Sequence, residues 1–122
     1  MCIRDRSAVT LSGGESQRIK LARELGRARR GARLIVMDEP DAGLHPADIE
    51  RLVSVLDRLV ESGDTIVAVG HRPALIEAAD HVIDLGPGPG RRGGRVVFAG
   101  PPESLMTCSE SATGRALKAA RA

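Results

Sequence analysis

Length, composition and charge limit what this chain of 122 residues can be. Its length suits one domain at most, and a single Phe with no Trp or Tyr excludes base stacking on aromatic side chains. Eighteen basic and sixteen acidic residues give a net charge of +2, which is too balanced to indicate nucleic-acid binding from charge alone.

Residues 1–6 spell the translation of a widely used sequencing-transposon adapter. We interpret them as an assembly scar and exclude them from fold reasoning. Cys2 and Cys108 have no second cysteine at C-x-x-C spacing, so they predict neither a disulfide framework nor a zinc site and fit a reduced cytoplasm. No apolar run approaches the ~20 residues of a membrane span, so no membrane contact is expected.

The first predicted element is a helix over residues 14–29, opened by the turn Leu11-Ser12-Gly13-Gly14-Glu15. Ser12 and Glu15 have the spacing of a capping box. The two glycines leave N–H groups uncovered at the positive end of the helix, where a phosphate can bind. Taken alone, a glycine-rich turn before a helix is more often only a turn without a ligand.

A short apolar run follows at residues 34–37 and ends in Asp38-Glu39-Pro40. Its length and composition predict a buried parallel strand, and open α/β sheets bind ligands at the carboxyl ends of such strands. Side chains alternate in direction along a strand, so one carboxylate could face a metal and the other a water, as phosphoryl transfer to water requires. Two solvated acids at a strand end are the alternative.

The next segments predict a βαβ unit and hence a parallel sheet. Pro46 suits a first helical position, and an apolar stripe of helical spacing continues until Gly63. A β-branched run over residues 65–69 predicts the second strand. His71 follows it, and from position alone it is either a loop histidine or a functional one.

The remainder of the chain alternates short elements with dense turn signals. We expect a short helix over 73–79, a strand over 82–85, a glycine- and proline-rich loop over 86–94, and a strand over 95–99 that pairs with the previous one as a hairpin. A short helix opens at Pro101-Pro102-Glu103. The tail from Thr113 is expected to be weakly helical and frayed.

Together, L-S-G-G-E-S-Q-R and the apolar strand before D-E-P resemble the signature and Walker B motifs of ABC-type ATPases. Within that group the chain resembles the UvrA family over nearly all of residues 10–118. The segments that carry this resemblance are Gly43-Leu44-His45, residues 79–87 and 93–97, and Thr113-Gly114-Arg115. It implies an α/β fold: a partial ABC-type P-loop ATPase domain, with a mostly parallel sheet, flanking helices and a C-terminal hairpin.

The resemblance implies that residues 7–118 are the C-terminal part of such a domain and residues 119–122 its tail. The sequence has no G-x-x-x-x-G-K-[ST], the Walker A loop that cradles nucleotide phosphates. We therefore expect the chain by itself to be inactive as an ATPase and to be part of a longer protein.

The resemblance also implies roles for individual residues with ATP and Mg²⁺. Asp38 would hold Mg²⁺ through water, Glu39 would orient or deprotonate the attacking water, and His71 would brace the γ-phosphate. The signature residues Leu11, Ser12, Gly13, Gly14 and Glu15 would close over nucleotide held by another ATPase half, and Gly43 and Leu44 would cross the seam between the halves.

The family resemblance implies a damage-recognition ATPase of bacterial nucleotide excision repair, in which ATP closes and hydrolysis opens a dimer that controls DNA binding. Its partners would be the other ATPase half or a second copy, DNA, and a UvrB-type protein; zinc is expected only in an upstream part. Gly70 stands where the family commonly has Glu, and Asp41-Ala42 where it has Thr-Thr. These departures leave open a resistance-type, UvrA-like ATPase, and a non-catalytic truncated gene product is a third interpretation.

Overall fold

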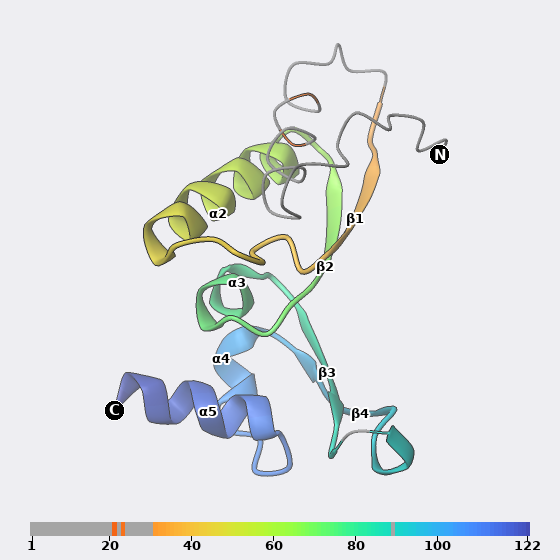
Figure 1. The fold of residues 1–122 in the computed structure, drawn as a ribbon. Helices are drawn as coiled ribbons and strands as arrows, with labels where there is room; N and C mark the ends of the chain where they lie inside the picture. Colours follow the sequence, from red (N-terminus) through yellow and green to blue (C-terminus); the bar gives the residue numbers. More distant parts are fainter. Residues whose placement is uncertain (1–20, 22, 24–30, 89) are drawn as a thin grey trace. The chain divides into compact units, whose positions relative to one another are not determined.

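A computed structural model describes residues 21, 23, 31–88 and 90–122 of the chain (Figure 1). The chain divides into two units, Met1–Gly70 and His71–Ala122, and we describe each by itself. The signature turn at residues 11–15, most of the predicted helix over 14–29 and the adapter-like residues 1–6 lie outside the described residues. No helix in the described part is long and apolar enough to cross a bilayer.

The first unit contains the predicted βαβ unit, in the order β1 (Leu34–Asp38), α2 (Pro46–Glu61) and β2 (Thr65–Val69). The two strands pair in parallel, with Leu34 opposite Thr65 and Asp38 opposite Val69. The predicted parallel strands and the helix that connects them are therefore confirmed. Because the strands run in the same direction, Asp38 and Val69 lie at the same edge of the pair, where both strands end.

Helix α2 begins and packs as its sequence predicts. Pro46 occupies the first turn, and the Nδ1 atom of His45, the N-cap residue, accepts a hydrogen bond from the Ala47 N–H at 3.4 Å. The apolar stripe is buried and packs toward β2. Its buried members are Ile49, Leu52, Leu56 and Leu59.

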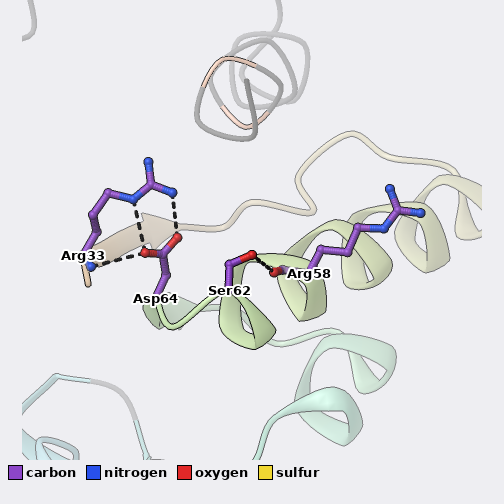
Figure 2. Close-up of polar contacts among 4 residues, drawn as sticks. All are labelled: Arg33, Arg58, Ser62 and Asp64. Atoms are coloured by element: carbon purple, nitrogen blue, oxygen red, sulfur yellow. Dashed lines mark hydrogen bonds and ion pairs between the residues drawn. The ribbon is translucent and has the colours of Figure 1, made fainter. Parts of the chain in front are cut away.

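The C-terminal end of α2 leads directly into an ion pair that joins the two strands (Figure 2). Ser62 donates both its N–H and its hydroxyl to the Arg58 carbonyl, and Gly63 continues the chain at a φ of 97°. The next residue, Asp64, has a fully buried side chain, which accepts from the Nη2 of Arg33 at 2.6 Å and from its Nε and backbone N at 3.2 Å. This pair connects the residue before β1 to the residue before β2.

The second unit is built on an antiparallel hairpin. Strand β3 pairs with β4 as predicted, with Val82 opposite Gly100 and an irregularity in register between Asp84 and Leu85. Its core contains Ile76, Leu105 and Leu117. In chain order its elements are α3 (Pro73–Ala78), β3 (Val82–Gly86), η2 (Gly90–Arg92), β4 (Arg95–Gly100), α4 (Pro102–Leu105) and α5 (Ala112–Arg121).

Three expectations need correction. The strand over residues 34–37 was predicted to be buried, but Leu34 and Val36 are 67% and 66% exposed and only Met37 is buried. The described strands form one parallel pair and one antiparallel pair in separate two-stranded sheets, so the prediction of a mostly parallel sheet holds only for β1 and β2. The prediction of a frayed tail is wrong, because α5 runs from Ala112 to Arg121 and buries Leu117 in the core of its unit. The tail is therefore a packed helix.

Side-chain hydrogen bonds to β3 explain why α5 is ordered. The Ser111 hydroxyl accepts from the Gly114 N–H at 2.8 Å, which caps the helix, and donates to Asp84 at 2.6 Å. The Thr113 hydroxyl donates to the other carboxylate oxygen of Asp84 at 2.9 Å. Asp84, which lies 27 positions before Ser111 in the chain, thus holds the start of α5 in place.

One face of the β1–β2 pair is apolar and exposed. Leu34, Val36, Val67 and Val69 share this face by strand alternation and register, and between 48% and 67% of each residue is exposed. The opposite face includes Met37, which is buried. An uncovered apolar strand face promotes association with other molecules.

We expect the 122-residue chain to self-associate through this apolar face. Replacing Val36 and Val67 by Thr keeps the β-branched shape and makes the face polar. The double variant should show less concentration-dependent light scattering and less binding of a hydrophobic dye than the unchanged chain. A chain that stays monomeric over the same concentration range before any substitution would contradict this expectation.

We also expect Gly114→Ala to destabilise the second unit. A Cβ at Gly114 would overlap the Leu105 carbonyl oxygen, which is backbone and cannot move aside easily. Overpacking of this kind costs about 1–3 kcal/mol or more. The control is Gly88→Ala, whose Cβ would make only an ordinary 3.6 Å contact with Arg92. Urea unfolding followed by circular dichroism should separate the two variants, and equal midpoints would refute the close approach.

Candidate functional site

The two acidic residues at the end of β1 lie at the edge where parallel strands place ligands. Asp38 is the last residue of β1 and stands opposite Val69, the last residue of β2. Both Asp38 and Glu39 are exposed. The sequence-based placement of an acidic pair at the carboxyl end of a parallel strand is confirmed.

Glu39 does not continue the strand, and this differs from the alternation that we expected. Its φ is 45°, in the left-handed region, and its N–H donates to the Val69 carbonyl at 2.7 Å. A side chain in this region costs roughly 1–2 kcal/mol relative to the ordinary regions. The bond to Val69 and the fully buried Pro40 that follows hold it in place. Such strain is concentrated at functional sites.

A tight turn follows the acidic pair and leads to α2. The Ala42 N–H donates to the Glu39 carbonyl at 3.0 Å, and the Leu44 N–H donates to the Asp41 carbonyl at 3.2 Å. Gly43 is exposed and has a φ of 72°, which favours glycine, whereas Leu44 is buried with 5% of its surface exposed. The turn therefore presents Gly43 at the surface and uses Leu44 as an anchor.

The predicted site residues fall into three groups. Asp38, Glu39, Gly43 and Leu44 lie on one continuous segment of the first unit. His71 is exposed and is the first residue of the second unit, two positions after Val69 in the chain. The signature residues 11–15 lie outside the described residues.

The acidic pair suits a divalent cation that is held partly by other ligands. Within the described ranges, no group of three or more His, Cys, Asp or Glu side chains could hold a metal. Mg²⁺ typically uses one or two carboxylates and takes its other ligands from water and substrate phosphates. Asp38, exposed and next to Glu39, fits this kind of coordination, and a closed metal centre built only from protein side chains is not indicated for the described part.

The left-handed backbone of Glu39 was not predicted from the sequence. The only local signal is Pro40, because a residue before proline is disfavoured in the right-handed helical region. That signal predicts a break after β1 but does not distinguish an extended residue from a left-handed one. The bond to Val69, 30 positions later in the chain, was needed to identify it.

Comparisons with known proteins identify relatives of this chain. It is 50% identical to the UvrABC system protein A of Rickettsia bellii over 113 residues, which cover 93% of this chain and 12% of that protein. It is also 50% identical to the UvrABC system protein A of Bacillus subtilis over 111 residues, or 91% of this chain. The chain thus spans 12% of the length of these curated relatives. No family model matches it.

A solved structure agrees with the sequence comparison. The chain superposes on the crystal structure of UvrA2 from Deinococcus radiodurans with a TM-score of 0.85 at 45% sequence identity. The match covers 92% of this chain and 14% of the UvrA2 chain. These matches confirm the resemblance to UvrA that the motifs predicted.

The backbone at Glu39 predicts an unusual order of stability. Glu39→Gly should be more stable than Glu39→Ala by about 0.5–1 kcal/mol, because glycine avoids the left-handed penalty but loses more chain entropy on folding. At Asp38, inside a strand, the order should reverse and the alanine variant should be the more stable. Urea unfolding of the four variants measures both differences. Alanine equal to or better than glycine at position 39 would show that the residue is not strained.

Proposed function

We propose that this chain, which matches UvrA proteins at half of the aligned positions, is a segment of a UvrA-type ATPase of bacterial nucleotide excision repair. The observation that carries the proposal is the acidic pair at the carboxyl end of β1, in a parallel βαβ unit. ATP hydrolysis uses a group that holds the metal and another that positions or deprotonates the attacking water, and these two carboxylates would supply both.

Asp38 and Glu39 divide this work according to their backbone positions. Asp38 ends a regular strand and would hold Mg²⁺, directly or through water, beside the nucleotide phosphates. Glu39 has turned out of the strand, and its exposed carboxylate would accept a hydrogen bond from the attacking water and orient or deprotonate it. The Val69 carbonyl fixes the Glu39 N–H, so the backbone that carries this carboxylate is held in place.

The other nucleotide contacts come from segments on either side of the acidic pair. The signature residues Leu11, Ser12, Gly13, Gly14 and Glu15 would bind the γ-phosphate at a helix N-terminus. That nucleotide would be held by the Walker A loop of the other ATPase half or a second copy. Gly43, exposed on the turn after Glu39, would lie at the seam between the halves, and His71 would brace the γ-phosphate.

In the longer protein, closing of two such halves on ATP and opening after hydrolysis would control DNA binding and contact with a UvrB-type partner. Two departures favour a second candidate, a resistance-type paralogue of UvrA. Asp41 and Ala42 replace the Thr-Thr common in the family, and Gly70 replaces a Glu before His71. Neither departure removes a group that the hydrolysis step uses, so both candidates share the same ATPase chemistry.

A segment exchange tests the role of Glu39. Residues of this chain can replace the matching stretch of the Bacillus subtilis UvrABC system protein A, to which they are 50% identical. In that protein Glu39→Gln should leave ATP binding intact and slow turnover by roughly 10²–10⁴-fold, the contribution typical of a positioned base. Phosphate release and equilibrium binding of labelled ATP measure the two effects.

The matched control is Asp57→Asn, which neutralises an exposed acid on α2 outside the site and should leave turnover unchanged. The 122-residue chain alone should bind no ATP at micromolar concentration, because it lacks the Walker A loop. Unchanged turnover with Glu39→Gln would remove Glu39 from the mechanism. Micromolar binding of ATP by the chain alone would show that the nucleotide site is elsewhere.

A further inference from the structure

The closed end of the β3–β4 hairpin concentrates positive charge. Arg91 and Arg92 lie in η2, Arg95 begins β4, and all three side chains are exposed. No acidic residue occurs in the sequence between Asp84 and Glu103. We call residues 90–95, which read Gly-Arg-Arg-Gly-Gly-Arg, the arginine tip. Figure 1 shows that this end of the hairpin projects away from α4 and α5.

The three guanidinium groups of the arginine tip are not used within the described part of the chain, where none of them forms a hydrogen bond or an ion pair. Other arginines differ in this respect. Arg33 pairs with Asp64, and Arg121 pairs with Glu77 at 3.0 Å. The positive charge of the tip is therefore available to an anion from outside.

The composition of the arginine tip shows which kind of anion it suits. It contains no apolar side chain, whereas a protein–protein interface normally has an apolar core inside a polar rim. Phosphate contacts need no such core, and the planar arginine fork binds phosphate oxygens in pairs. Glycines at positions 93 and 94 add no bulk that would keep a polymer backbone away.

The shape of the hairpin and the lack of aromatic residues favour a duplex over a single-stranded nucleic acid. A two-stranded ribbon fits the major groove of a duplex. Binding of single strands relies on aromatic stacking platforms, and the only aromatic residue of the chain is Phe98. We propose that the arginine tip of the β3–β4 hairpin is a contact surface for the phosphate backbone of duplex DNA.

This inference rests on the proposed function only for the choice of DNA as the biological polyanion. The contact has a defined electrostatic signature. Each phosphate that a protein neutralises contributes about 0.9 to the slope of log affinity against log salt, so three arginines contribute roughly 3. The contact does not read sequence, because phosphates carry no sequence information directly.

The test measures binding of the 122-residue chain to a short fluorescein-labelled duplex by anisotropy, without nucleotide, between about 50 and 200 mM salt. The hairpin variant carries Arg91→Gln, Arg92→Gln and Arg95→Gln. The control variant carries Arg51→Gln, Arg58→Gln and Lys118→Gln, which are exposed residues outside the tip and remove the same charge. The magnitude of the slope of log affinity against log salt should fall by roughly 3 in the hairpin variant and by less than 1 in the control variant.

A third variant separates charge from folding. Changing the same three arginines to lysine keeps the charge, so most of the salt slope should return. Equal losses in the hairpin and control variants would overturn the proposal, as would no binding of the duplex by the unchanged chain at low salt. Competition by polyglutamate as effective as by unlabelled DNA would instead indicate an acidic protein partner. Because the assay contains no ATP, a negative result for the arginine tip leaves the proposed role of Glu39 in hydrolysis intact. Likewise, a negative result for Glu39 leaves the proposed DNA contact of the arginine tip intact.

Discussion

The ion pair between Arg33 and Asp64 fixes the geometry on which the acidic site depends. Arg33 is the residue before β1 and Asp64 the residue before β2, so their fork aligns the two strands at their start (Figure 2). A slip of one residue would turn every side chain of a strand to the opposite face. At the other end of the same register, Asp38 stands opposite Val69, and Val69 holds Glu39. The position of the acidic pair therefore follows from a contact at the far end of the strands.

A carboxylate has the same function in both units, and it is buried in the first (Asp64) and half-buried in the second (Asp84). A buried ion pair stabilises a fold only when its remaining hydrogen-bond sites are satisfied. Asp64 meets this requirement because it accepts from the backbone N–H of Arg33 as well as from the guanidinium. Asp84 accepts from the hydroxyls of Ser111 and Thr113 and so anchors α5. Each carboxylate joins segments about 30 residues apart, and the separations are 31 residues for Asp64 and 27 and 29 for Asp84.

The extent to which the fold was predictable follows from the range of the interactions involved. Strands β1 and β2 and helix α2 were predictable because apolar periodicity, Pro46 and Gly63 are local signals. The order of α5 was not predicted because it depends on Asp84, which lies 27 residues before Ser111. The pairing of Arg33 with Asp64 was not predicted because it too joins residues that are far apart in the sequence. At the site, the motif predicted the acidic pair at the end of β1, but the left-handed backbone of Glu39 depends on Val69 and could be identified only in the structure. The roles of residues 11–15 and His71 came from family resemblance.

The arginine tip shows why a nearly balanced net charge is a poor guide to binding. Net charge sums over the whole chain, whereas a phosphate responds mainly to charges within a Debye length, about 8 Å at physiological salt. Residues 85–102 contain three basic residues and no acidic one, although the chain as a whole has a net charge of only +2. Within its unit, the hairpin end that carries those charges projects away from α4 and α5 (Figure 1). A duplex that binds the hairpin contacts the local charge of the hairpin and not the average charge of the chain. Charge segregation along a β-ribbon can thus create a contact for a polyanion in a protein whose overall composition argues against one.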